Sequence, residues 1–143
     1  ILAIGLFLIL IAHPMADNIL YYQFQNGNRD NWKEAFALIA DLKEVDDLVV
    51  TTHQDLADYY LQEGTMSMQG QEVSNIREWQ NRTWFVIDLT ALDKAPQIHQ
   101  WVLQNAVLVA NLDVNVSART FPMRVYLYDP QHSFTGATID SSR

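Results

Sequence analysis

The most informative segment of the chain is residues 83–89, which read Thr-Trp-Phe-Val-Ile-Asp-Leu. A short apolar run that is rich in β-branched and aromatic residues is typical of a buried strand. A second run of this kind, Leu-Val-Val-Thr-Thr, occupies residues 48–52. The two runs predict two strands of the sheet of an α/β domain.

Helical patterns lie on both sides of these strands. Apolar residues recur at helical spacing over residues 32–43. A second helix is expected to start with Asp55 as its N-cap and to end near Gly64, and a third helix starts at Pro96. Residues 64–82 are polar and aperiodic, so we expect them to form a mobile excursion between the second helix and the strand at 83–89.

The C-terminal part of the chain predicts two more strands. Apolar and polar residues alternate over residues 107–116, which indicates a strand with one wet face. An alternation recurs over residues 123–128 and indicates the last strand. We expect the last strand to pair antiparallel with the one before it. The element order α-β-α-β-α-β-β then predicts a small, mostly parallel sheet with an antiparallel edge strand and packing helices.

Composition narrows the class of protein. The 143 residues include nine Lys and Arg against 17 Asp and Glu, a formal net charge of −8. This balance argues against a nucleic-acid partner, which would require a clustered basic face. The sequence contains no Cys, so disulfides, thiol catalysis, iron–sulfur clusters and Cys-ligated zinc are excluded.

The N-terminal run Ile1–Ala12 has no polar side chain. Three interpretations compete: the C-terminal half of a transmembrane helix, the apolar core of a signal peptide, and a buried core helix. We favour the first, because a surface helix would show a polar stripe and no basic region precedes the run. A complete span would need about 20 residues.

The expected organisation is therefore a partial transmembrane helix at 1–16, an α/β soluble domain at 17–129 and a flexible tail at 130–143. The loop at 13–31 holds one Arg and two Asp. Few basic residues beside a membrane favour the non-cytoplasmic side, so we expect the domain to be membrane-tethered and extracytoplasmic.

The candidate site lies where the strand at 48–52 gives way to a helix. Ligands of open α/β sheets bind outside the carboxyl ends of the strands, and a helix N-terminus offers free N–H groups. We therefore name Thr52, His53 and Gln54, with Tyr59 on the following helix, as candidate ligand-binding residues. The competing interpretation is that the segment only caps the helix. We identify no catalytic residues, no metal ligands and no cofactor.

Several segments together resemble the C-terminal soluble domain of multi-spanning membrane glycosyltransferases of the protein O-mannosyltransferase-like, GT-C type. The resembling segments are Arg29–Lys33, Asp46–His53, Tyr59-Tyr60, Arg82–Ile87 and Val125–Tyr128. The resemblance covers nearly the whole chain and consists in the order of these segments and the types of residue in them. It implies transfer of a sugar from a polyprenyl-phosphate carrier to an acceptor outside the cytoplasm. The family's catalytic acidic residue lies in its first extracytoplasmic loop, which corresponds to no position of this sequence.

Two functions follow from these observations. The first is a non-catalytic domain of a lipid-linked-sugar glycosyltransferase that helps to bind or orient the acceptor. The second is a single-helix, membrane-anchored accessory subunit of a larger membrane complex. The expected partners are the lipid bilayer and, for the first function, a polyprenyl-phosphate sugar and its acceptor. For the second function, the expected partners are other membrane subunits. An exposed aromatic face at Tyr126 and Tyr128 would favour the second function.

Overall fold

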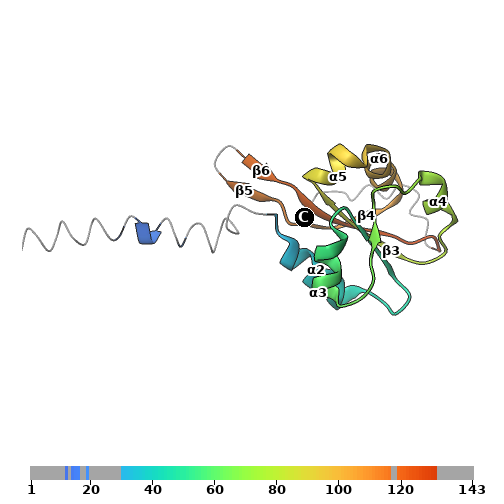
Figure 1. Cartoon of the computed structure of the whole chain (residues 1–143), viewed down its shortest axis with the longest axis horizontal. Helices are drawn as coiled ribbons and strands as arrows, with labels where there is room; N and C mark the ends of the chain where they lie inside the picture. Colours follow the sequence, from blue (N-terminus) through green and yellow to red (C-terminus); the bar gives the residue numbers. More distant parts are fainter. Residues whose placement is uncertain (1–11, 13, 17–18, 20–29, 117–118, 132–143) are drawn as a thin grey trace, which may run out of the picture.

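The computed structural model describes residues 12, 14–16, 19, 30–116 and 119–131 (Figure 1). The helices are α2 (Trp32–Leu42), α3 (Gln54–Leu61), α4 (Val73–Glu78), α5 (Leu89–Lys94) and α6 (Pro96–Asn105). The strands are β1 (Leu48–Thr51), β2 (Met66–Ser67), β3 (Thr83–Asp88), β4 (Val107–Asn111), β5 (Val114–Val116), β6 (Arg119–Phe121) and β7 (Met123–Tyr128). The expected α/β class is confirmed.

Five of the strands form one sheet in the order β2-β1-β3-β7-β4, and β5 and β6 form a separate hairpin. Strand β1 pairs in parallel with β2 and β3, whereas β7 pairs antiparallel with β3 and β4. The sheet is therefore mixed, and the prediction of a mostly parallel sheet was too strong. The predicted antiparallel pairing of the last strand with the long strand before it is confirmed.

The position of β7 differs from the expected edge. It lies between β3 and β4, and both of its faces are covered, because Val125 packs on one side and Tyr126 on the other. The alternation over 123–128 did not distinguish an edge strand from an interior one. A tyrosine can be buried in an aromatic cluster, so the pattern misplaced the strand.

Two hydrophobic cores lie on opposite faces of the sheet. Trp84 and Val86 of β3 face the core that α2 and α3 cover, whereas Phe85 and Ile87 face the core that α4, α5 and α6 cover. In Figure 1, α2 and α3 lie on one side of the strands and α5 and α6 on the other. The domain is thus a three-layer α/β/α structure, and β3 is buried along its whole length.

The chain leaves β1 and β3 in opposite directions. After β1 it enters α3, which packs on the α2 face, and after β3 it enters α5, which packs on the other face. Since the two strands are parallel neighbours, their carboxyl ends open between diverging helices. This is a topological switch point, the place where open α/β sheets bind ligands. The fold therefore places residues 52–53 and 88–90 at such a crevice.

The segment 64–82 is folded, and the expectation of a mobile excursion was wrong. It contributes β2 and α4, and its two largest apolar anchors, Met68 and Ile76, are fully buried against β3 and α6. Two buried apolar residues among many polar ones produce no helical or strand periodicity, so the sequence pattern did not reveal that this segment packs on the sheet. The sequence also missed α5, which follows β3 directly.

The strand expected over 107–116 divides at residues 112–113. Asp113 causes the break, because its Oδ1 accepts the backbone N–H of Met123 at 2.9 Å and its Oδ2 contacts Arg124 at 3.3 Å. These contacts tie the β4–β5 turn to the start of β7.

The predicted partial transmembrane helix at 1–16 falls mostly outside the described residues. Among the residues that are described, no helix combines the length and the hydropathy that a membrane crossing requires. Most of the expected tail at 130–143 also lies outside them.

Replacing Ile76 with Ala is expected to lower the free energy of unfolding by about 2–5 kcal/mol, because it leaves a cavity between α4 and the sheet. Urea unfolding followed by tryptophan fluorescence measures the change. The matched control is the neighbouring, exposed Arg77→Ala, which should change stability by less than about 0.5 kcal/mol. Equal effects of the two substitutions would show that 64–82 does not pack on the sheet.

Candidate functional site

The site begins with the residues that follow β1 and β3. The parallel register aligns Thr51 with Val86, so the next two positions on each strand come together. Thr52 Oγ1 donates a hydrogen bond of 2.8 Å to Oδ1 of Asp88. Asp88 Oδ1 also accepts a hydrogen bond of 2.9 Å from the backbone N–H of Ala91, and this bond caps the N-terminus of α5. Asp88 therefore joins the two strand ends and starts the following helix.

His53 completes the contact between the two strand ends. Its Nε2 lies 3.3 Å from Oδ2 of Asp88 and 3.3 Å from Oγ1 of Thr90. The Asp88 side chain is 1% exposed, whereas that of His53 is 41% exposed. A buried carboxylate requires hydrogen-bond donors to offset its desolvation. Thr52 and the α5 N-terminus supply them to Oδ1, whereas Oδ2 accepts no hydrogen bond from the described residues and lies at ion-pair distance from His53. Of these groups, only His53 extends to the surface.

Asp30 and Trp32 border the pair on its other side. Burial raises the pKa of Asp30, the negative charge of Asp88 raises it further, and His53 lowers it. Asp30 is thus close enough for its charge to act on both members of the pair. The Trp32 ring meets the His53 ring edge-on, with centroids 5.0 Å apart, and stacks on Phe36 at 5.7 Å. The aromatic contact holds the imidazole against one wall.

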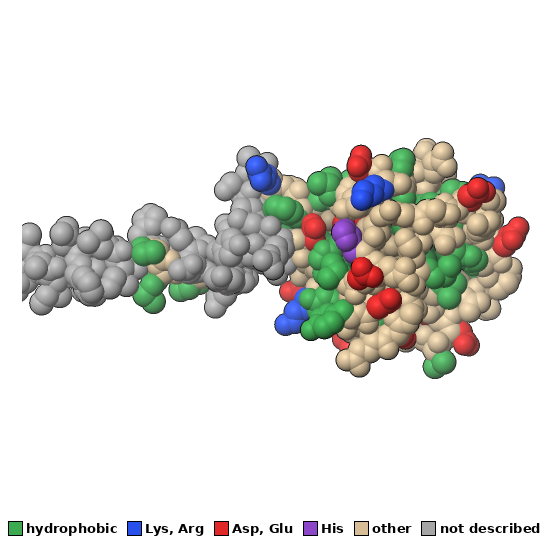
Figure 2. Space-filling view, in the orientation of Figure 1, with side chains coloured by type: hydrophobic (Ala, Val, Ile, Leu, Met, Phe, Trp, Pro, Cys, Tyr) green, Lys and Arg blue, Asp and Glu red, His purple; other side chains and the backbone are tan. Residues whose placement is uncertain are grey.

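A cavity of about 660 Å³ opens beside His53, and α5 forms most of it. Its lining residues are His53, Leu89, Thr90, Leu92, Asp93 and Lys94. Leu89 is 59% exposed, so the cavity has an apolar wall next to its polar groups. Figure 2 shows acidic, basic and hydrophobic side chains close together, with a histidine among them, on the face of the domain that it presents.

The geometry favours binding over nucleophilic catalysis. In a Ser-His-Asp arrangement, the acid and the nucleophile contact different ring nitrogens. Here Asp88 and Thr90 both contact Nε2, so the acid does not orient the ring from the nitrogen opposite the one that would take the proton of Thr90. The Nδ1 atom has no hydrogen-bond partner among the described residues. In that part of the chain, no group of three or more acidic or His residues is arranged to hold a metal ion.

The structure brings together two of the four candidate residues, Thr52 and His53. Gln54 turns away and donates a 2.7 Å hydrogen bond to the carbonyl of Thr65, which ties α3 to the start of β2. Tyr59 is 75% exposed on α3 and contacts Tyr60 at 5.2 Å between ring centroids. A ligand role for Gln54 and Tyr59 remains a prediction.

The capping interpretation of this segment changes in detail. Helix α3 begins at Gln54 with His53 at the cap position, and the His53 side chain makes no capping hydrogen bond. Asp55 lies in the first turn instead of at the cap. His53 is therefore free of the helix terminus and directed to Asp88.

Four residues of the site were not named from the sequence: Asp30, Trp32, Asp88 and Thr90. The sequence did contain a signal for Asp88. Asp88 is an acidic residue at the end of the buried strand at 83–89, just as residues 52–53 are polar residues at the end of the strand at 48–52. Carboxyl ends of adjacent parallel strands meet at one sheet edge. Asp30 precedes α2 and Trp32 is its first residue. No local sequence pattern links either residue to strand ends further along the chain.

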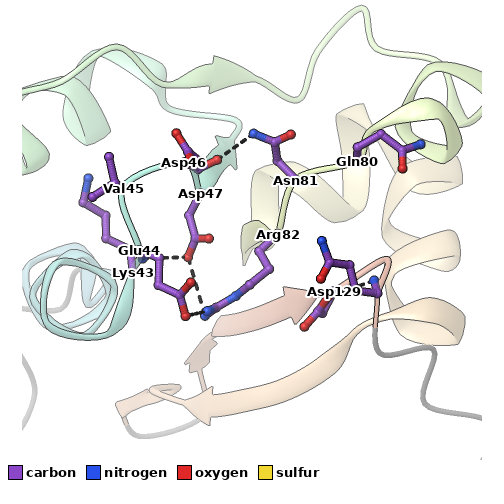
Figure 3. Close-up of a pocket in the computed structure, with 10 residues that line it drawn as sticks. Lys43, Glu44, Val45, Asp46, Asp47, Gln80, Asn81, Arg82 and Asp129 are labelled. Carbon is purple, nitrogen blue, oxygen red and sulfur yellow. Dashed lines mark hydrogen bonds and ion pairs between the residues drawn. The ribbon is translucent and has the colours of Figure 1, made fainter.

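A second cavity, of about 780 Å³, lies at the opposite end of β1 and β3 (Figure 3). Arg82 forms ion pairs with Glu44 and, at 3.5 Å, with Asp47. Asp47 also accepts the indole N–H of Trp84 at 2.7 Å, and burial raises the pKa of its carboxyl while this hydrogen bond opposes the rise. Asn81 donates to the Asp46 carbonyl at 2.8 Å. These contacts bind the loop between α2 and β1 to the start of β3, so we assign them a structural role.

Comparisons of the chain with protein-family models, with curated proteins and with solved structures find no match.

Replacing Asp30 with Asn is expected to stabilise the protein at neutral pH. Because folding raises the pKa of this carboxyl, the folded state binds the proton more tightly than the unfolded state, and ionisation lowers stability above the folded pKa. Below 3.8, the ordinary value, the group is protonated in both states and the penalty is absent. The unfolding free energies of variant and wild type, measured in urea from pH 3 to 7, should diverge as pH rises through this window.

The control is Asp55→Asn, which removes an exposed carboxylate from the first turn of α3. It should lower stability at pH 7 by up to about 1 kcal/mol, because acidic residues are favourable at that position. An Asp30→Asn variant that is also less stable at pH 7 would contradict the expectation and assign a favourable contact to the ionised Asp30.

Proposed function

We propose that this chain is the extracytoplasmic C-terminal domain of a lipid-linked-sugar glycosyltransferase, and that it binds the acceptor without carrying out the chemistry. The observation that carries the proposal is the buried Asp88 joined to Thr52 and His53 at the switch point between β1 and β3. The fold offers this crevice as a ligand site. Its groups suit hydrogen bonding to a ligand and do not form a nucleophilic relay.

Support for an acceptor-binding role comes from the contrast between buried and accessible groups. Asp88 is inaccessible, and the His53 ring beside it contacts Thr90 and Trp32, whereas the ring also lines the cavity beside α5. A polar group fixed by a buried partner loses little conformational freedom when it binds. Such preorganisation is suited to orienting an acceptor for an active site elsewhere in a larger protein.

The accessory-subunit function lacks the surface that would favour it. Tyr126 is 5% exposed, and Tyr128 packs against Trp101 with ring centroids 4.9 Å apart. The aromatic face at Tyr126 and Tyr128 that would favour an accessory subunit is therefore buried at Tyr126 and packed against Trp101 of α6 at Tyr128. We retain the glycosyltransferase domain as the proposal.

The first test is the intact mass of the native polypeptide, recovered from membranes with an antibody against residues 30–131. We expect a species several times heavier than these 143 residues, with further hydrophobic peptides on digestion, because sugar transfer from a lipid carrier requires upstream membrane spans. A species only slightly heavier than this chain would overturn the proposal.

The second test is kinetic and uses that native polypeptide in membranes. His53→Gln should raise the acceptor KM by about 2- to 10-fold, the worth of one neutral hydrogen bond, with a smaller effect on kcat, since His53 binds and does not react. Sugar transfer is measured against acceptor concentration. The control is Asp55→Asn, outside the cavity, with an unchanged KM. A loss confined to kcat would contradict a binding role.

A further inference from the structure

The chemical class of the ligand can be read from the charges at the switch point. Three carboxylates, Asp30, Asp88 and Asp93, lie at or beside the cavity, and Lys94 is the cationic residue among those that line it. A phosphoryl group would therefore meet more negative than positive charge here, and like charges repel. The local charge therefore disfavours a phosphorylated ligand.

The helix N-termini at the crevice do not reverse this preference. A free helix N-terminus attracts anions because its first N–H groups are unsatisfied. At α5 the carboxylate of Asp88 already accepts the N–H of Ala91, and at α3 the acidic Asp55 lies in the first turn. The protein's own carboxylates thus occupy or border the positions that an anion would take.

The accessible polar groups are mainly hydrogen-bond acceptors. Asp88 is an acceptor and lies 3.3 Å from Nε2, so the neutral form of the ring carries its hydrogen on Nε2, beside Asp88 and Thr90, and has Nδ1 as an acceptor. The exposed Asp93 carboxylate lines the same cavity and also accepts. A ligand here must donate hydrogen bonds. Neutral hydroxyl groups donate such hydrogen bonds, and each can accept one from Lys94 as well.

The walls of the cavity agree with such a ligand. Leu89 and Leu92 present apolar surface beside the polar groups. A sugar ring has hydroxyl groups around its rim and C–H groups on its faces, so it can donate to the acceptors while a face covers the leucines. The volume of about 660 Å³ is within the usual range of small-molecule sites.

We infer that the cavity between His53 and α5 takes an uncharged, hydroxyl-bearing ligand, a sugar or a related polyol, and that Nδ1 of His53 accepts one of its hydroxyl hydrogens. This inference rests on the proposed acceptor-binding function and specifies the chemistry of the group that is bound. Asp88, Trp32 and Thr52 act as positioning residues for the imidazole.

The test uses the whole 143-residue chain, labelled with ¹⁵N, in a detergent without a sugar headgroup, such as lauryldimethylamine oxide. The probes are methyl α-glucopyranoside, glucose 6-phosphate and inorganic phosphate. NMR follows the ring nitrogens of His53 and the backbone amides of Leu89, Thr90 and Leu92. We expect the neutral glycoside to shift these signals saturably and to bind at least several-fold more tightly than either phosphate.

Two variants separate binding from folding. In His53→Gln the amide nitrogen replaces Nε2 and can still donate to Asp88, while the Nδ1 acceptor is lost. We expect unchanged amide spectra outside the cavity and a 2- to 10-fold weaker affinity for the glycoside. Asp55→Asn, which lies outside the cavity, should bind the glycoside as the wild type does.

Tighter binding of glucose 6-phosphate or inorganic phosphate would overturn the inference and define an anion site, while the proposed function would stand if the acceptor KM still responds to His53→Gln. An absence of glycoside-induced shifts in the cavity would also overturn the inference. The proposed function itself fails on the intact mass or on an unchanged acceptor KM, so the two failures are distinguishable.

Discussion

Burial of β3 on both faces is the constraint on which the rest of the domain depends. Its six residues are all buried, and successive side chains enter the two cores in turn. A strand with no wet face needs hydrogen-bonded neighbours on both edges and a helical layer on each side. Strands β1 and β7 supply the neighbours, and helices α2 to α6 supply the layers. A folded 64–82 segment follows from this, because β3 needs the cover that Met68 and Ile76 provide.

The same constraint creates the candidate site. A strand that stays buried to its last residue delivers the side chain of Asp88 into the protein interior. The carboxylate is tolerated there because Thr52, the first turn of α5 and His53 all contact it. Each of these partners lies just beyond a strand end, so the contacts also fix how β1 and β3 turn into their helices. The site is thus part of the region where the sheet connects to the helices on its two faces. The contacts that fix these connections also position the imidazole.

Local sequence patterns predicted the parts of the fold that depend on local burial. The runs at 48–52 and 83–89 became β1 and β3, and the helices at 32–43 and from Pro96 became α2 and α6 within two residues. The patterns failed where pairing is non-local. The place of β7 between β3 and β4 depends on contacts across the sheet, and neither face of its alternating sequence distinguishes an edge from an interior strand. The same limit explains why only half of the site could be predicted. Thr52 and His53 follow a strand that the sequence identifies. Their partner Asp88 lies 36 residues beyond Thr52 and meets it only through the parallel register.

The two ends of β3 show how similar groups acquire different roles. Each end has a nearly inaccessible aspartate, Asp47 beside Trp84 at one end and Asp88 at the other. Asp47 is held by Arg82, a permanently charged residue that also pairs with Glu44, and by the Trp84 indole N–H. The partners of Asp47 are thus all engaged in contacts within the protein, and these contacts connect the loop between α2 and β1 to the start of β3. Asp88 is instead held by a hydroxyl, a backbone N–H and an imidazole, and the imidazole has a second nitrogen that faces no partner in the described part of the chain. An imidazole that lies beside a buried carboxylate with one nitrogen can still engage a ligand with the other. This difference in partners, and not the presence of an acidic residue, is the reason to place ligand binding at the carboxyl ends of β1 and β3.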